Sequence, residues 1–342
     1  MLFVTGGADR LRSHRAIENL VGVVSGTGVA GGIGVFGTVP DHAEFAALVG
    51  SLSGNPAGGS PTFGPLPPCL KPPFAVSVEG VRLPFVASAN RPAGTAPGPR
   101  RGAYLVPPRD GGVLADGWLV GGPDAPQAGS ALSSDDVIRI VEQAIASADE
   151  TRAAIRLPLG SRAKMVIAVS DLDGTLLALN RMPDATAFSI DAAVAKARNV
   201  IFFSRGLRDA DLPGVPSDTA ITNRTISFGA QPLYPPGITG SDPGPFFDLF
   251  RLDLENPCSQ GEDSSNRANI NGVVFFPGSV PLYSNGRLVG GLGISGDGVE
   301  QDDVVAAFGG VGFEAPDEIR ADQFFIGGLR LPYLRFSRNP GN

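Results

Sequence analysis

The sequence has few of the side chains that most often bind metals or carry out nucleophilic catalysis. Its 342 residues include two histidines, two cysteines, three methionines and one tryptophan. Both histidines, His14 and His42, lie near the start of the chain. A Ser/His/Asp or Cys/His catalytic set therefore cannot be assembled in the remainder of the sequence.

Positive charge and long apolar runs are also scarce. The chain has 27 basic against 34 acidic residues, a net charge of −7 and an isoelectric point near 4.9. This balance argues against binding to nucleic acid or to an anionic membrane surface, which needs clustered positive charge. No run of about 18 apolar residues is present, so no membrane span is predicted.

The cellular compartment stays open at this level. Met1–Arg10 lacks the basic and apolar regions of a signal peptide. An extracytoplasmic location is favoured if the natural chain begins upstream of Met1, and a cytoplasmic one otherwise. Cys69 and Cys258 are far apart in sequence and could pair or stay free, so they do not decide the question.

Glycine and proline are abundant, with 47 and 31 residues, and 42% of the chain is hydrophobic. The glycines follow no three-residue period, which excludes collagen, and the 20 phenylalanines exclude wholesale disorder. The length predicts two units or one large one. We therefore expect a globular, loop-rich protein.

An internal repeat explains part of this glycine content. The segment 31–50 (GGIGVFGTVPDHAEFAALVG) aligns without gaps with the segment 290–309 (GGLGISGDGVEQDDVVAAFG), 259 residues later. A second block, GVRLPF at 80–85, matches GLRLPY at 328–333, 248 residues later. Two blocks in the same order predict two copies of one structural unit, with 11 extra residues between the blocks of the first copy.

The repeat predicts an unequal division of the chain. We expect a truncated first copy in residues 1–92, a Gly/Pro-rich linker in 93–130, and a complete copy in 131–342 with an insertion at about 232–269. A first copy without its front half would expose strand edges. We therefore expect it to be completed by upstream residues or by another subunit.

The complete copy alternates helical and extended patterns. We expect a helix from Ser133 or Ser134 with Asp136 as its capping-box acid, and a second helix from Ser189. Strands are predicted at 164–170, 175–180, 272–276, 280–284 and 287–295, a third helix at 300–308, and an extended pair within 321–336. A short helix is expected from Ser217. The pattern predicts an α+β fold with helices packed on an antiparallel sheet.

Several local motifs resemble the GlcG/HbpS-like, haem-degrading domain family. The residues that carry the resemblance are Arg181-Met182-Pro183-Asp184-Ala185, Ala195-Lys196-Ala197-Arg198, the segment 276–283 (FPGSVPLY) and the segment 289–296 (VGGLGISG). The family tends to have Arg-Met-Asp-Gly-Ala at the first of these, so Pro183 departs from its pattern. The likeness covers Leu132 to Gly309.

The resemblance implies a profilin-like antiparallel sheet flanked by helices, homo-oligomers, and haem or other tetrapyrrole binding in some members. Met182, Tyr234 and Tyr283 are the available axial ligands of the complete copy, and Arg181, Lys196 and Arg205 could pair with propionates. The cofactor-binding residues that we predict from these motifs are Arg181, Met182, Lys196, Phe276, Pro281 and Tyr283. We predict no metal site and no catalytic residue.

An enzymatic alternative rests on Asp171-Leu172-Asp173-Gly174-Thr175-Leu176, which follows an apolar strand. This run matches the nucleophile motif of haloacid dehalogenase phosphatases, in which one Asp attacks phosphorus and the second acts as acid or base beside Mg²⁺. Asp297, Asp302 and Asp303 could supply the later acids. However, no lysine follows Ser204, and Asp-Gly is a common hairpin turn.

These patterns leave three functions open. The first is a non-enzymatic, oligomeric protein of the GlcG/HbpS type that binds haem or a small carboxylated ligand. The second is a structural subunit of a larger assembly or filament in which a neighbouring chain completes the first copy. The third is the Mg²⁺-dependent phosphatase using Asp171 and Asp173.

Overall fold

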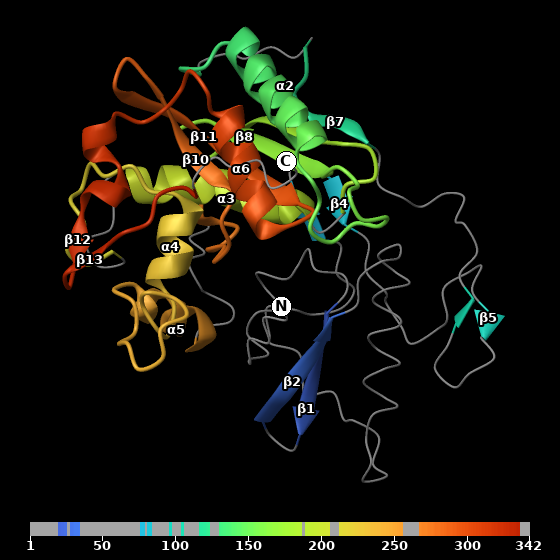
Figure 1. Cartoon of the computed structure of the whole chain (residues 1–342). Helices are drawn as coiled ribbons and strands as arrows, with labels where there is room; N and C mark the ends of the chain where they lie inside the picture. Colours follow the sequence, from blue (N-terminus) through green and yellow to red (C-terminus); the bar gives the residue numbers. More distant parts are fainter. Residues whose placement is uncertain are drawn as a thin grey trace. The chain divides into compact units, whose positions relative to one another are not determined.

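A computed structural model describes residues 116–123, 130–186, 189–205, 212–255 and 267–335, together with six short strands nearer the N-terminus. The chain divides into two compact units. The N-terminal unit is Met1–Leu114 with Asn256–Cys258, and the C-terminal unit is Ala115–Glu255 with Ser259–Asn342. Figure 1 shows the elements of both units.

The C-terminal unit is built on a five-stranded antiparallel sheet with the order β10-β11-β8-β9-β7. Its strands are β7 Gly117–Val120, β8 Met165–Ser170, β9 Leu176–Arg181, β10 Ser279–Ser284 and β11 Arg287–Gly296. The predicted antiparallel sheet is confirmed, and β8, β9, β10 and β11 match predicted strands to within a residue at each end. β7 lies within the expected linker 93–130 and pairs with β9, so the compact unit begins earlier than residue 131.

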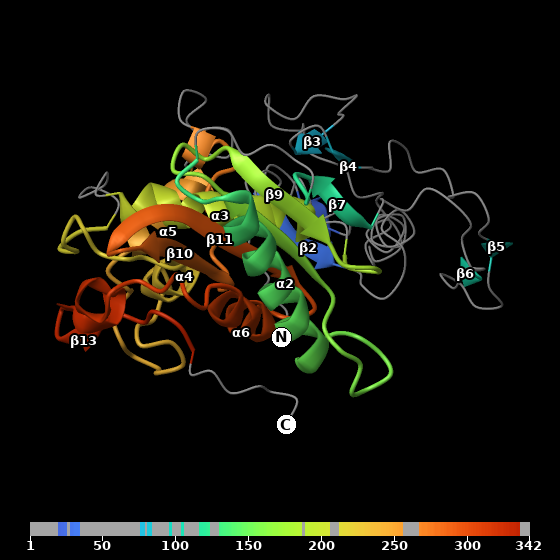
Figure 2. The same cartoon turned by 90° about the horizontal axis from the view of Figure 1, so that it is seen from above.

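Three helices cover the two faces of this sheet: α2 Ser134–Glu150, α3 Ser189–Ser204 and α6 Val299–Gly309. α2 and α6 lie side by side on one face (Figure 2), where Gly309 sits against Leu292 of β11 and Ala144 of α2. α3 covers the other face, and its Ala193 lies against Gly293 of β11. The core therefore has two layers of helix around one sheet.

The starts of the first two helices agree with the sequence. Ser133 caps α2: its side chain accepts a hydrogen bond from Asp136 N at 3.1 Å, and the Asp136 carboxylate accepts one from Ser133 N at 3.1 Å. This reciprocal capping box satisfies two backbone donors that a helix start leaves unpaired. α3 begins at Ser189, as its serine and the following apolar stripe predict.

The irregular segment after α3 forms a second hydrophobic cluster at the β10 edge of the sheet. It contains α4 Asn223–Gly229, α5 Phe247–Glu255 and the 3₁₀ turn η2 Arg267–Asn269. The expected helix from Ser217 begins at Asn223 because Thr222 supplies the cap. Further along the described chain come η3 Asp317–Ile319, η4 Ala321–Gln323, β12 Phe325–Ile326 and β13 Leu329–Arg330. Within the described residues, no helix has the length and apolarity that a membrane crossing requires.

One strand prediction is wrong, because residues 272–276 form no strand. Their backbone bonds to side chains instead. Asn199 Nδ2 donates to Gly272 O at 2.7 Å, Val274 N donates to Asn199 Oδ1 at 2.9 Å, and Asn223 Nδ2 donates to Val274 O at 2.6 Å. Buried asparagines thus satisfy the backbone groups that a sheet would otherwise pair.

The described strands of the N-terminal unit form three antiparallel hairpins. They are β1 Leu20–Ser25 with β2 Gly28–Gly34, β3 Val76–Val78 with β4 Val81–Leu83, and β5 Ala96–Pro97 with β6 Tyr104–Leu105. His14, His42, Cys69 and Cys258 lie outside the described residues.

Candidate functional site

Arg181 and Met182 close one end of the sheet. Arg181 ends β9 and is buried, its Nε donates to Ala185 O at 3.0 Å, and its Nη1 pairs with Asp116 at 2.7 Å. Met182 is 3% exposed, and its N donates to Met165 O at 3.0 Å. Both residues are therefore used by the fold at this end of the sheet.

The neighbouring Asp184 explains part of the motif. Its φ is 64°, in the left-handed region that favours glycine. The family pattern has Gly where this chain has Asp184, and Asp is one of the few other residues that adopts this conformation at modest cost. The departure from the pattern therefore preserves the turn.

Lys196 forms an ion pair that joins the helices on the two faces of the sheet. It is 1% exposed on α3, and its Nζ donates to Asp302 Oδ2 of α6 at 2.8 Å and to Ile294 O of β11 at 2.7 Å. Burial raises the pKa of Asp302 to about 6, although Lys196 acts in the opposite direction, and Asp297 raises it further. Lys196 is thus engaged inside the fold and is not free to bind a ligand carboxylate.

Gly278 makes room for this pair just before β10. Its φ is +116°, and a Cβ there would lie 2.5 Å from Asp302 Cβ and 2.9 Å from Lys196 Nζ. A larger residue would displace the lysine or the acid. The glycine of the Phe276–Tyr283 motif therefore serves the ion pair.

The other predicted ligand residues are part of the β10 edge. Pro281 and Tyr283 are buried in β10, and Phe276 is half-buried before it. Burial raises the pKa of Tyr283 to about 12, with a further contribution from Asp218. Since iron binds tyrosine as tyrosinate, this shift disfavours Tyr283 as an axial ligand.

The six predicted residues do not meet in one place. Arg181 pairs with Val166 near the start of β8, whereas Tyr283 lies beside Leu288, toward the end where Gly291 pairs with Ser170. At about 3.3 Å per residue, a strand such as β8 is close to 20 Å long. The motifs that contain these six residues are therefore spread over different parts of the fold.

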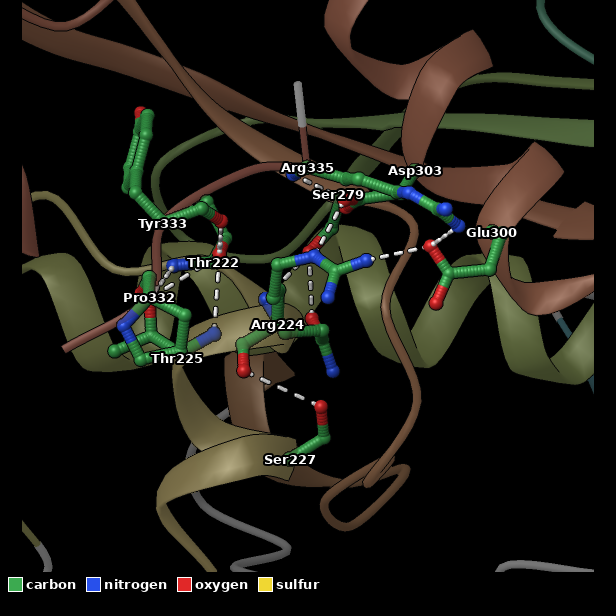
Figure 3. A network of polar contacts seen from close by, with 11 residues as sticks. Thr222, Arg224, Thr225, Ser227, Ser279, Glu300, Asp303, Pro332, Tyr333 and Arg335 are labelled. Atoms are coloured by element: carbon green, nitrogen blue, oxygen red, sulfur yellow. Dashed lines mark hydrogen bonds and ion pairs between the residues drawn. The ribbon is translucent and has the colours of Figure 1, made fainter. Parts of the chain in front are cut away.

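A second set of charges, with Arg224 and Asp303 buried and Glu300 and Arg335 partly exposed, surrounds the first turn of α6 (Figure 3). Arg224, in the first turn of α4, donates from Nε to Asp303 Oδ2 at 2.7 Å and from Nη2 to Glu300 Oε2 at 2.8 Å. Arg335 donates from its backbone N to Asp303 Oδ2 at 2.8 Å and from Nη1 to Glu300 Oε2 at 2.5 Å. Burial raises the pKa of Asp303, with Arg224 opposing the shift.

The same network holds the last described segment of the chain against α4. Thr225 Oγ1 donates to Pro332 O at 2.7 Å, and Thr222 Oγ1 donates to Tyr333 O (Figure 3). Each acid of the cluster is balanced by a cation, so the cluster carries no surplus charge that would attract an ion. Across the described residues, no group of three or more His, Cys, Asp or Glu could hold a metal.

The phosphatase motif forms the tight turn between β8 and β9. Asp173 Oδ1 accepts from Thr175 N at 2.8 Å and Oδ2 accepts from Thr175 Oγ1 at 2.9 Å, and these bonds lower the pKa of Asp173. Asp171 Oδ1 accepts from Leu172 N at 2.7 Å. The two carboxylates therefore shape a hairpin turn, as the Asp-Gly pair favours.

Asp297, the first of the later acids of that motif, lies at the opposite end of β8 from Asp171. Gly296 pairs with Met165 at the start of β8, while Asp171 follows the last residue of β8. Asp297, which follows Gly296, is thus separated from Asp171 by about the length of a six-residue strand, close to 20 Å, whereas Asp302 and Asp303 are held in ion pairs with Lys196 and Arg224. The geometry does not assemble a phosphoryl-transfer centre from these residues.

One exposed surface was not predicted, and we call it the aliphatic loop, residues 151–163. Ile155, Leu157 and Leu159 are 55%, 80% and 86% exposed. Ala153 N donates to Ser161 O and Ala163 N donates to Thr151 O, both at 2.8 Å, so the base is a short antiparallel ladder. Such an exposed apolar loop is a candidate binding surface.

Arg156 fixes this loop to the end of the sheet. Its Nε donates to the buried Asp297 Oδ2 at 2.6 Å, and its Nη2 donates to Asp184 O at 2.8 Å. Ala154 N also donates to Asp297 O at 2.8 Å. Arg152 and Arg162 face each other across the ladder and remain exposed. Two exposed arginines therefore lie at the base of the loop that carries the apolar side chains.

The ionisation of Asp302 gives a prediction for the pH dependence of stability. Because its pKa is about 6 in the folded unit and lower when unfolded, the folded unit holds the proton more tightly between about pH 4 and pH 6. Stability from this group is present at low pH and is lost as the pH rises through about 6. Relative to Asp302→Asn, the natural chain should lose stability over this interval in urea unfolding; parallel curves would contradict this.

Comparison with protein families matches residues 132–309 to "Haem degrading protein HbpS-like". No curated protein matches the chain. Among solved structures, the PduOC complex with heme is similar at 24% identity, covering 52% of this chain and 92% of that one with a TM-score of 0.33. The ORFY protein of Klebsiella pneumoniae is similar at 19% identity, covering 54% and 92% with a TM-score of 0.34.

HbpS of Streptomyces reticuli, in a double mutant, is similar at 17% identity, covering 59% of this chain and 97% of that one with a TM-score of 0.30. The family match extends from the residue before the α2 cap to the last residue of α6, which is more than half of the chain. It includes the four motifs found in the sequence. The chain therefore belongs to the HbpS-like family.

Proposed function

We propose that this chain is a non-enzymatic protein that binds haem or a related carboxylated tetrapyrrole and works as an oligomer. The observation that carries the proposal is the HbpS-like match over residues 132–309, which takes in the helices and all but one strand of the five-stranded sheet. The phosphatase alternative has no assembled centre, because Asp171 and Asp297 lie at opposite ends of β8. Binding is therefore the function that the unit supports best.

The aliphatic loop is the surface of the described C-terminal unit that best suits such a ligand. A tetrapyrrole has a broad apolar ring and, at one edge, two carboxylates. Leu157 and Leu159 offer exposed apolar area, and Arg152 and Arg162 offer charge beside it. Arg181 and Lys196 are buried, whereas Arg152 and Arg162 are exposed, with Arg162 Nη1 donating to Glu150 O at 2.8 Å, so the exposed arginines are better placed to reach the ligand.

The described C-terminal unit offers no accessible axial ligand. It contains no histidine, and Met182, Tyr234 and Tyr283 are all buried. Binding there would depend on the ring and its carboxylates rather than on the iron. Metal-free protoporphyrin IX should therefore bind nearly as tightly as haemin.

This predicts the outcome of a titration followed by the Soret band and by tryptophan fluorescence. Replacing both Leu157 and Leu159 by serine should weaken binding about tenfold or more, because two apolar contacts of roughly 1 kcal/mol each are lost. Ile238→Ser is a matched control, since Ile238 is 53% exposed elsewhere, and it should leave affinity within about twofold.

A different experimental result would contradict each part of the proposal. Absence of any spectral change with both ligands would overturn tetrapyrrole binding. Much tighter binding of haemin than of protoporphyrin IX, lost in His14→Ala or His42→Ala, would move the site to the N-terminal unit. Decay of the haem spectrum in the presence of ascorbate would overturn the non-enzymatic assignment, and a monomer in light scattering would overturn the oligomer.

A further inference from the structure

The hairpin β1–β2 of the N-terminal unit has the same pairing as the hairpin β10–β11. Leu20 pairs with Gly34, and Ser279 pairs with Gly293, so both partners are shifted by 259 residues. All six partner pairs of the two hairpins obey this shift. The register is therefore the one that the sequence repeat predicts.

Two further details agree. Each hairpin has an irregularity at the same place, between Val23 and Val24 in one and between Leu282 and Tyr283 in the other. The short hairpin β3–β4 also matches β12–β13, since Ser77 pairs with Arg82 and Phe325 with Arg330, a shift of 248 residues. Bulges are features that a fold retains for a reason.

The glycines of β11 show what this hairpin is shaped to receive. A Cβ at Gly293 would lie 2.1 Å from Ala193 O, and one at Gly291 would lie 2.3 Å from Ala197 O. The backbone of α3 therefore packs directly on these two glycines. Along the edge that does not face β10, β11 pairs with β8 from Gly291↔Ser170 to Gly296↔Met165.

β2 keeps these glycines at equivalent register positions. Gly32 and Gly34 correspond to Gly291 and Gly293, and they share one face because successive strand residues alternate. Among the strands described for the N-terminal unit, β1 and β2 pair only with each other. An isolated two-stranded hairpin is marginally stable in water, so these strands need further packing.

We propose that β2 is a docking edge for the front half of another HbpS-like unit, a segment equivalent to residues 131–204. Its strand would pair with β2 as β8 pairs with β11. Its helix would place small residues four apart, as Ala193 and Ala197 are in α3, against Gly32 and Gly34. The partner is thus a hairpin followed by an alanine-bearing helix, and the inference does not depend on any bound ligand.

The test supplies this partner directly. A second copy of residues 131–204 is fused before Met1 of the full chain, with Cys69 and Cys258 replaced by serine. Ile33 corresponds to Leu292, which pairs with Val169. Ile33→Cys should therefore form a disulfide with Val169→Cys of the fused segment, because opposed residues of antiparallel strands lie within disulfide range.

A register-shifted pair provides the first control. Val166→Cys of the fused segment should not cross-link to Ile33→Cys, since its equivalent partner is Ser295 rather than Leu292. Equal cross-linking of both pairs, or none in the matched pair, would overturn the proposal. Peptide mapping after oxidation shows which of the two cysteine pairs has formed a disulfide.

Glycine substitutions provide the second readout, by hydrogen exchange of the peptide covering β2. The fused segment should slow exchange at least tenfold, and Gly32→Val with Gly34→Val should remove this protection. Gly28→Arg is the matched control, because Gly28 corresponds to Arg287, which is exposed in β11. Exchange unchanged by the fusion, or protection that survives the double valine variant, would contradict the docking edge.

Discussion

Replacing Lys196 by methionine is expected to destabilise the C-terminal unit by about 3–5 kcal/mol at pH 7. The change keeps most of the side-chain volume but removes the cation that faces Asp302 Oδ2 at 2.8 Å. Asp302 Oδ1 already has no hydrogen-bond partner within the described residues. The variant would therefore leave a buried carboxylate without a positively charged partner, which is among the most costly arrangements in a protein interior.

A double-mutant cycle separates the ion pair from simple packing. Asp302→Leu alone leaves the lysine charge buried and should also be costly, whereas Lys196→Met with Asp302→Leu should be less destabilised than the sum by about 2 kcal/mol or more. The measurement is chemical unfolding of each variant. Additive costs would show that the two side chains act independently and would contradict the assignment.

An exposed pair supplies the control. Lys164 Nζ lies 3.0 Å from Asp149 Oδ1, but both side chains are partly exposed. Lys164→Met should change stability by no more than about 1 kcal/mol. The cost of Lys196→Met should also shrink near pH 4, because without its cation Asp302 is protonated there and no charge remains buried.

The sheet and the helices that cover it could be predicted from local patterns. The capping box at Ser133, the start of α3 at Ser189 and the adjacent strands β10 and β11 each depend on residues within a few positions of one another. Where backbone groups bond to distant side chains, the same reasoning fails. The segment 272–276 looks like a strand, and only Asn199 and Asn223 show why it is not one.

The partners of the charged residues in the candidate site could not be predicted from the sequence, for a related reason. Lys196 and Arg198 sit in an otherwise apolar helix pattern, which signals buried charges but does not identify their partners. Asp302 is 106 residues away from Lys196, and Gly174 O, which accepts from Arg198 Nε at 2.8 Å, belongs to a turn. Motif residues that suggest ligand binding in sequence can thus be the ones that hold the layers together.

The sequence of the aliphatic loop has a pattern that indicates exposed apolar side chains. Ile155, Leu157 and Leu159 alternate with polar or small residues, which resembles a strand, yet Pro158 and Gly160 interrupt the pattern. Alternation broken by proline and glycine just before a buried strand predicts a loop with apolar side chains facing solvent. Only the three-dimensional structure shows that Arg156 anchors it to Asp297.

Replacing Gly293 by alanine is expected to cost about 3 kcal/mol or more, although it adds a single methyl group. The new Cβ would lie 2.1 Å from Ala193 O and 2.4 Å from Ala197 N, both backbone atoms of α3. Backbone cannot swing aside as a flexible side chain can, so α3 must move away from the sheet. That shift would also weaken the Lys196 pair and the contacts of Val200 and Ile201 with Gly291.

The measurement is again chemical unfolding, with Gly160→Ala as the control. Gly160 has a φ of +93° and open space around it, so its substitution carries only the backbone strain, about 1–2 kcal/mol. A cost for Gly293→Ala no larger than for Gly160→Ala would mean that α3 does not pack on β11 as described. It would also remove the physical reason for expecting a helix on Gly32 and Gly34, so this variant tests the basis of the proposed docking edge.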